Sequence, residues 1–112
     1  MKKIEAIIRE EKLDIVRRVL EDNGYFGMTV SEVSGRGRQK GLSLQWRAGE
    51  YRVDFLPKLK IEVVILDEDV SKILHAIASC ARTGEMGDGK IFVFPVDNAV
   101  RIRTGEDGDN AI

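Results

Sequence analysis

The sequence is poor in the features that mark secreted, membrane-spanning and nucleic-acid-binding chains. It has one cysteine, Cys80, which excludes an intrachain disulfide network and a cysteine-rich metal site. No apolar run approaches the ~20 residues of a membrane-spanning helix, and the first nine residues are too charged for a signal peptide. With 18 basic and 19 acidic residues, the net charge is -1, so the chain as a whole is not attracted to nucleic acid or to an anionic membrane. We expect a cytoplasmic protein that reaches a membrane only when a partner recruits it.

The remaining composition is that of a small globular domain. Hydrophobic residues make up 43% and charged residues 33% of 112 residues, which suits a single domain over residues 1–112. Hydrophobic periodicity predicts alternating strands and helices. The expected elements are strands at Lys2–Ile8, Met28–Val33, Tyr51–Ile65 and Ile91–Val96, and helices at Lys12–Asn23 and after Asp67, whose side chain is expected to cap the second helix.

The longest expected strand carries the clearest pattern. From Tyr51 to Ile65 every odd position is apolar or aromatic, and most even positions are charged. Pro57 lacks an N–H, so the strand should lie at an edge or be bulged there. Val100–Arg103 is expected to add a short strand, and the polar tail from Gly105 is expected to be mobile.

This order, βαββαβ, predicts an α+β ferredoxin-like fold of two split βαβ units. Two helices would cover one face of an antiparallel sheet. The other face still carries apolar side chains, so we expect it to be covered by a partner, most simply by copies of the same chain.

About sixteen residues join the second and third expected strands, where a tight hairpin would suffice. Connections of this length in a compact domain are usually functional or disordered. Alternating glycines and four cations suit an anionic ligand, and three large apolar side chains without a core suit docking on a partner. These residues are Gly35, Gly37 and Gly41; Arg36, Arg38, Lys40 and Arg47; and Leu42, Leu44 and Trp46. The alternative is a disordered, solvated loop.

A second glycine-rich segment, residues 83–90, is called the glycine loop below. It contains the string G-x-x-x-x-G-K from Gly84 to Lys90, but Ile91 follows where a P-loop offers a hydroxyl to magnesium. It also follows a helix instead of opening one, so the helix dipole there disfavours phosphate. Phosphate binding would need loop amides, Lys90, and Arg101 with Arg103 on one side of the extra strand. A glycine turn with solvated arginines is the alternative.

Three further side chains have ordinary interpretations. Gln39 and Lys58 flank the long connection, and with a metal ion they could hold a small dicarboxylate, although surface roles are the default. His75 lies off the apolar stripe of its helix and has no partner ligands in the sequence pattern. We find no nucleophile–base pair and no metal-ligand motif.

The chain resembles the PII signal-transduction proteins (the GlnB and GlnK type) over essentially its whole length. The matching segments are residues 2–8, 27–33, 35–41, 50–58, 83–93 and 100–106, and the second and fifth look like the two signature regions of the family. The resemblance divides the domain into a T-loop at about 36–54, a B-loop at about 82–90 and a C-terminal region at about 97–112. It also implies a homotrimer in which ATP and ADP compete for clefts between subunits.

The resemblance assigns residues to each effector. Those expected at the nucleotide are Ile7, Gly35, Arg36, Gly37, Arg38, Gln39, Glu62, Val64, Gly87, Asp88, Gly89, Lys90, Arg101 and Arg103, with Gly27, Met28 and Thr29 from the adjacent subunit. 2-Oxoglutarate is expected beside magnesium-ATP, where Gln39 completes the Mg2+ shell and Lys58 pairs with a carboxylate. Lys40, Gly41 and Gly87 are expected to line the 2-oxoglutarate site.

The T-loop of the family docks on nitrogen-metabolism targets, such as ammonium channels and glutamine synthetase or its regulators. Arg47 stands where the family plugs an ammonium channel, and Leu44 and Trp46 are expected to contact the partner. Tyr51 stands where many bacterial members are uridylylated. The nearest alternative is a PII-like relative that senses another nucleotide or a small anion; an enzyme with more than slow ATP hydrolysis, and a nucleic-acid binder, fit the sequence less well.

Overall fold

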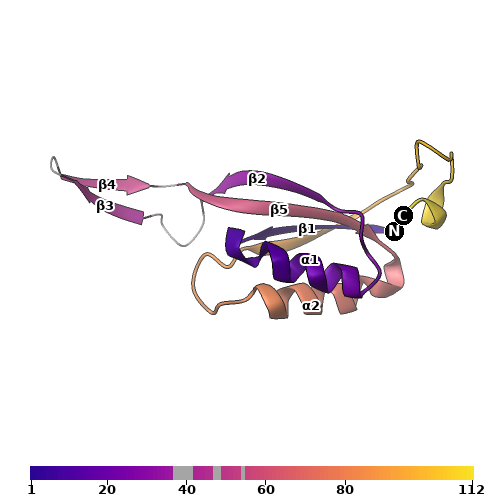
Figure 1. Ribbon diagram of the computed structural model, residues 1–112, viewed down its shortest axis with the longest axis horizontal. Coiled ribbons are helices and arrows are strands. Elements are labelled where there is room, and N and C mark those ends of the chain that lie inside the picture. The colour runs from indigo at the N-terminus through magenta and orange to yellow at the C-terminus, as the bar shows by residue number, and fades with distance from the viewer. Residues whose placement is uncertain (37–41, 47–48, 54) are drawn as a thin grey trace.

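Four strands form one antiparallel sheet in the computed structural model, which describes residues 1–36, 42–46, 49–53 and 55–112. The strands are β1 (Lys2–Ile8), β2 (Thr29–Gly35), β5 (Leu56–Ile65) and β6 (Lys90–Pro95). Their order is β2-β5-β1-β6, and each adjacent pair is antiparallel (Figure 1). The predicted ferredoxin-like fold is confirmed.

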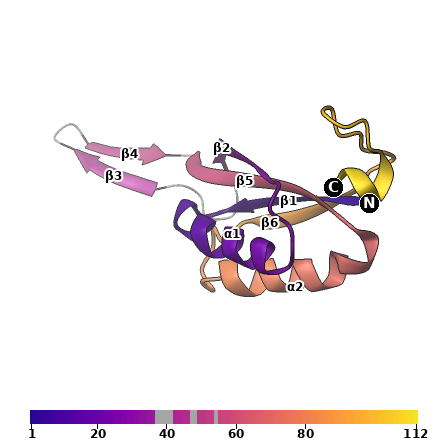
Figure 2. The same ribbon diagram turned by 45° about the vertical axis from the view of Figure 1, so that its right-hand side comes forward.

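Two helices, α1 (Leu13–Asp22) and α2 (Val70–Ala81), cover one face of this sheet (Figures 1 and 2). Each is preceded by a 3-10 turn, at Glu10–Lys12 and Asp67–Asp69. The core between the layers follows from the predicted periodicities, because alternate strand positions and one helical stripe point inward. Its fully buried members include Ile4, Ile8, Val16, Leu20, Ile61, Ile65, Ile73 and Ile77.

The expected fifteen-residue strand is two strands in the structure, β4 (Gly49–Val53) and β5. β4 leaves the main sheet and pairs with β3 (Leu42–Trp46). Predicting a single strand was therefore wrong, since alternation along a chain does not reveal a change of pairing partner. The expectation for Pro57 is confirmed: it lies opposite Ser34, beyond Leu59, where pairing of β5 with β1 ends.

The long connection thus contains a two-stranded sheet, which projects from the end of the main sheet (Figure 1). Its register sets Leu44 opposite Tyr51 and Trp46 opposite Gly49. β3 lies in a segment where no strand was expected. Six residues with expected roles lie outside the described residues: Gly37, Arg38, Gln39, Lys40, Gly41 and Arg47.

The start of α2 differs from the prediction. No side chain caps the 3-10 turn or the helix that follows it. The Asp67 carboxylate instead accepts a hydrogen bond from the Met1 ammonium at 2.9 Å and lies 3.7 Å from the Lys2 Nζ. This ion pair lowers the pKa of Asp67, the hydrogen bond from the Met1 ammonium being the main cause. The Asp67 carboxylate is thus bonded to the Met1 ammonium and not to the backbone amides at the start of α2.

The C-terminal region also departs from expectation. No strand forms at 100–103; Val100 makes only an isolated bridge to Asp107, and the Gly105 amide closes a turn by donating to the Arg101 carbonyl at 2.8 Å. The tail from Gly105 folds back through a 3-10 turn at Gly108–Ala111, and its expected mobility stays a prediction. Figure 1 shows that the two chain ends lie close together.

The sheet face away from the helices is partly apolar and partly charged. Phe92 and Phe94 are 47% and 41% exposed on this face. Lys60 lies between Glu5, at 3.8 Å, and Glu62, at 3.3 Å. A partner surface over this face stays a prediction. Within the described ranges, no helix is long and apolar enough to cross a membrane.

Candidate functional site

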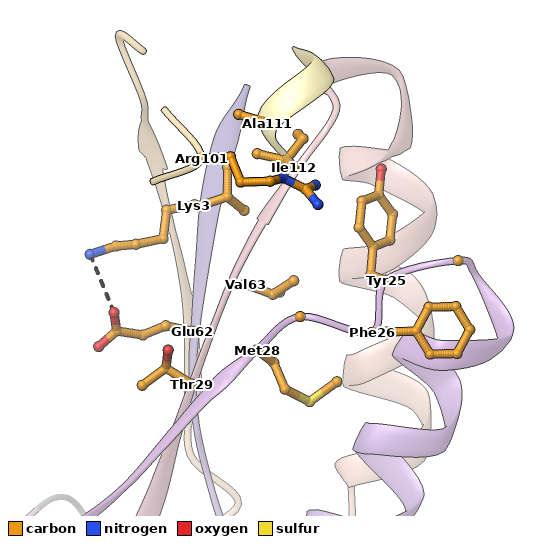
Figure 3. A pocket seen from close by; sticks show the side chains of 13 residues that line it. Lys3, Tyr25, Phe26, Met28, Thr29, Glu62, Val63, Arg101, Ala111 and Ile112 are labelled. Carbon is orange, nitrogen blue, oxygen red and sulfur yellow. Dashed lines mark ion pairs between the residues drawn. The ribbon is translucent and has the colours of Figure 1, made fainter. Parts of the chain in front are cut away.

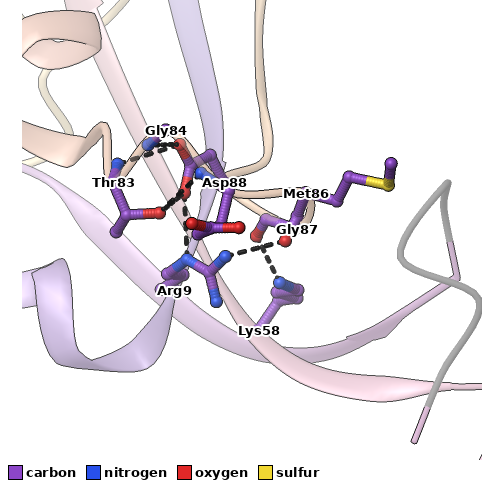
Figure 4. Close-up of polar contacts among 8 residues, drawn as sticks. Arg9, Lys58, Thr83, Gly84, Met86, Gly87 and Asp88 are labelled. Carbon is purple, nitrogen blue, oxygen red and sulfur yellow. Dashed lines mark hydrogen bonds and ion pairs between the residues drawn. The ribbon is translucent and has the colours of Figure 1, made fainter.

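Most of the described residues that are expected to bind nucleotide fall into two groups at opposite ends of the sheet. One group surrounds a cavity of about 680 Å³ near the chain termini (Figure 3). The other lies in and around the glycine loop, between α2 and β6 (Figure 4). β5 passes both groups: Glu62 lines the cavity, and Lys58 contacts the glycine loop. These residues are four apart, about 13 Å along a strand that rises ~3.3 Å per residue.

The cavity lies where β2 leaves the sheet. Pairing between β2 and β5 ends with Thr29 opposite Glu62, so β5 has no β2 partner from Val63 onward. Six of the expected nucleotide residues line this cavity: Gly27, Met28, Thr29, Glu62, Val64 and Arg101. Its other lining residues are Lys3, Gly24, Tyr25, Phe26, Val63, Ala111 and Ile112. Sequence reasoning missed these, because the chain segments that meet here are far apart in the sequence.

Charged groups and apolar walls share this cavity. The Lys3 Nζ lies 3.9 Å from Glu62 and 4.9 Å from the ring centre of Phe94. In Figure 3, Arg101 lies between Lys3 and Ile112, and the Met28 side chain lies below them. A cavity with apolar walls and a few polar groups is typical of a small-molecule site.

Tyr25 joins the cavity to the start of α2. Its hydroxyl donates to the Asp69 carboxylate and accepts from the Leu66 amide at 3.1 Å. Burial, and then the hydrogen bond to Asp69, raise the pKa of Tyr25, whereas the same bond is the main cause of the lowered pKa of Asp69. The phenol therefore stays protonated and fixes one wall of the cavity.

In the glycine loop, hydrogen bonds join the Asp88 carboxylate to Thr83 and Gly84 and so close a ring of residues 83–88. The carboxylate accepts hydrogen bonds from the Thr83 amide and the Gly84 amide, each at 2.9 Å, and from the Thr83 hydroxyl (Figure 4). These bonds, led by that of the Thr83 side chain, hold the pKa of Asp88 well below its usual range. The carboxylate is therefore turned toward the loop's own donors.

The loop requires glycine at particular positions. Gly84, Gly87 and Gly89 have φ values of +91°, +97° and +98°, which L side chains rarely adopt. At Gly89 space is also lacking, since a Cβ would lie 1.7 Å from the Ile7 carbonyl oxygen. Among the described residues, the amides of Gly87 and Gly89 have no hydrogen-bond acceptor. Backbone donors without an internal partner next to the Lys90 cation suit an anionic group.

Lys58 connects β5 to this loop. Its side chain is buried, and its Nζ donates to the Gly87 carbonyl at 2.5 Å. Burial and then the nearby Arg9 cation lower the pKa of Lys58. Gly35 lies beside it, since a Cβ there would be 3.4 Å from the Lys58 Cγ. Ile7 and Lys58 thus contact the glycine loop, and Gly35 lies beside Lys58.

Other expected site residues are placed differently. Arg103 lies on an exposed turn and does not line the cavity, so the expectation that it shares a strand face with Arg101 is wrong. Arg36 is exposed at the end of β2. Leu44, Trp46 and Tyr51 are placed by backbone alone. Arg9, which sequence reasoning missed, contacts both Met86 and Asp88.

Comparisons with known proteins agree on one family. The family model described as "Nitrogen regulatory protein P-II" matches residues 1–106. The "Nitrogen regulatory protein P-II" of Pasteurella multocida is 57% identical over 112 residues and covers both chains completely. The protein of that name from Synechocystis sp. is also 57% identical over 112 residues, all of both chains. The "Nitrogen regulatory protein P-II 2" of Methanothermobacter thermautotrophicus is 55% identical over this whole chain and 97% of its own length.

Proposed function

Because the chain belongs to the P-II family of nitrogen regulatory proteins, we propose that it senses adenine nucleotides at sites shared between neighbouring copies of a homotrimer. Membership of the family gives the chain a role in nitrogen-regulatory signalling. ATP and ADP compete for the same three clefts, and the protein regulates targets instead of catalysing a reaction. It acts in the cytoplasm and comes to a membrane only with a partner.

One observation carries the proposal: each chain has two groups of expected nucleotide residues, one around a cavity and one around the glycine loop, at opposite ends of its sheet. We take each group as one half of a site. The cavity half offers apolar walls, Glu62 and Arg101. The glycine-loop half offers backbone amides, Lys58 and Lys90. If a neighbouring copy sets its cavity against the glycine loop of the first, the base and the phosphates of one nucleotide reach both halves. Closed rotational symmetry would repeat this contact around the trimer.

The two halves provide a direct test by mixing variants. Lys90→Gln damages the glycine-loop half and Arg101→Gln damages the cavity half, so each variant alone should bind ATP at least tenfold more weakly than the unchanged protein. After unfolding and refolding together in equal amounts, about a quarter of the clefts should combine two intact halves. Calorimetry should then recover about a quarter of the high-affinity sites.

Recovery of no sites after mixing would place both halves in one copy and contradict the proposal. A protein that elutes as a monomer from a sizing column, or that binds neither ATP nor ADP at millimolar concentration, would end it. Subunit exchange is verified by mass spectrometry of a tagged copy.

The further effector is 2-oxoglutarate, bound with Mg2+ and ATP. The glycine loop supports this, since in the part of the chain that the structure describes the Gly89 amide has no acceptor, and the Lys90 cation follows it. Gln39 would complete the Mg2+ shell, and Lys58 would exchange the Gly87 carbonyl for a carboxylate of 2-oxoglutarate. The metal supplies charge neutralisation between the phosphates and that carboxylate.

Ligand binding then controls the partner through the hairpin of β3 and β4, by favouring one of its conformations. The proposed targets are an ammonium channel or glutamine synthetase and its regulators, contacted through Leu44, Trp46 and Arg47, with Tyr51 open to modification. Pull-downs from cell extract with ATP or ADP, with and without 2-oxoglutarate, test this step. A partner set that is identical under all conditions contradicts the regulation; a response to other nucleotides alone would favour a PII-like relative.

A further inference from the structure

Arg9 links the first strand to the glycine loop across most of the sequence. It follows β1 directly, in extended conformation, and its side chain is only 17% exposed. Its Nε donates to Asp88 Oδ1 at 3.0 Å, and its Nη2 donates to the Met86 carbonyl at 2.8 Å (Figure 4). One planar guanidinium therefore holds two points of the loop at once, which an ammonium group cannot do in the same geometry.

These contacts fix the loop at the place where an anion would bind. Asp88 closes the ring onto Thr83 and Gly84, and Arg9 ties this ring to the end of β1. The Met86 carbonyl and the Gly87 amide belong to one peptide plane, so this plane cannot turn over without breaking the bond to Arg9. The backbone at Gly89 packs directly against the Ile7 carbonyl, which is possible because glycine has no Cβ. The amide directions at Gly87 and Gly89 thus depend on a side chain outside the loop.

We propose that Arg9 is a positioning residue for phosphate binding, which orients the glycine-loop amides through Asp88 and Met86 without itself touching the nucleotide. The inference rests on the proposed nucleotide function. Its physical basis is preorganisation: donors already aimed at the anion spare the free energy of ordering them when it binds. The guanidinium is engaged in the loop by two of its three nitrogens.

The first test needs no nucleotide. In the ligand-free protein, the amide resonances of Gly87 and Gly89 should shift in Arg9→Gln and move back part of the way in Arg9→Lys, which keeps the charge. Arg18→Gln is the matched control, because it removes the same charge from an exposed position of α1. Unchanged Gly87 and Gly89 resonances in Arg9→Gln would overturn the inference, whether or not the protein binds nucleotides.

The second test measures ADP affinity by calorimetry. Relative to the unchanged protein, Arg9→Gln should weaken ADP binding about tenfold, as expected for the loss of charge-assisted hydrogen bonds that support the site. Arg9→Lys should lie between the two, and Arg18→Gln should match the unchanged protein. If the unchanged protein binds ADP and Arg9→Gln binds it equally well, the inference fails while the proposed function stands.

A double-mutant cycle identifies the route of the effect. If Arg9 acts through Asp88, the combined Arg9→Gln and Asp88→Asn variant should lose clearly less affinity than the two single losses added together. Additive losses would mean that Arg9 and Asp88 act independently, which contradicts the proposed route through Asp88. Thermal unfolding of each variant confirms that the binding data refer to folded protein.

Discussion

Replacement of Gly89 by alanine tests the close approach of the glycine loop to β1. Two penalties are expected. The φ of +98° costs an L residue about 1–2 kcal/mol. The new Cβ would also lie 1.7 Å from the Ile7 carbonyl oxygen, whereas real Cβ contacts essentially never fall below 3.0 Å, so the loop must move by at least 1.3 Å, the difference between the two.

A shift of that size matters more for binding than for folding. Amide donors 2.7–3.2 Å from a phosphate oxygen lose their geometry when displaced by more than 1 Å. We expect Gly89→Ala to lower the free energy of unfolding by about 2–4 kcal/mol and to weaken ATP binding at least tenfold. Urea unfolding and calorimetry measure the two quantities on the same sample.

Gly84→Ala is the matched control, because its φ is +91° and a Cβ there would meet nothing within 4 Å. It should show the backbone penalty alone, about 1–2 kcal/mol, with ATP affinity nearly unchanged. If Gly89→Ala matched Gly84→Ala in both stability and ATP affinity, the contact with Ile7 would not constrain the loop, and the reasoning above would be refuted.

Two further predictions concern side-chain hydrogen bonds. Tyr25→Phe should lower the free energy of unfolding by about 1–2 kcal/mol, since it removes the hydroxyl that bridges Asp69 and the Leu66 amide; exposed Phe26→Leu is the control, and equal urea midpoints would contradict it. Asp88 has a lowered pKa, so its contribution to stability is complete above the ordinary value of 3.8 and is lost as pH falls through the folded value. Unfolding at pH 7 and pH 3 should therefore show a smaller loss in Asp88→Asn than in the unchanged protein, and equal losses would refute this.

Much of the fold could be predicted because it depends on local patterns. Alternation placed β1 at Lys2–Ile8 as observed, and helical spacing placed Ile73 and Ile77 of α2 in the core. Element order was then sufficient for the ferredoxin-like topology. The strand-pairing change near residue 54 was not predictable in this way, because β4 and β5 have the same alternation but different partners.

Two of the missed features depend on contacts between distant segments. Asp67 is a residue type that often caps helices, but its carboxylate instead accepts a hydrogen bond from the Met1 ammonium, 66 positions away. The turn at Gly105 is local, since its amide donates to the Arg101 carbonyl, but no strand pattern in the sequence predicts it. Arg9 carries no local signal, because its partners are 77 and 79 positions away.

The site also answers an electrostatic difficulty that the sequence raised. The glycine loop follows the C-terminal end of α2, where the helix dipole is negative and disfavours phosphate. The structure adds an acidic side chain at the same place, Asp88, but directs it onto the Thr83 and Gly84 amides, beside Arg9. The charge of Asp88 is thereby compensated by Arg9, and the Lys90 cation and the glycine amides lie on the same loop. A phosphate site at the wrong end of a helix becomes possible because one arginine and one aspartate compensate each other behind it.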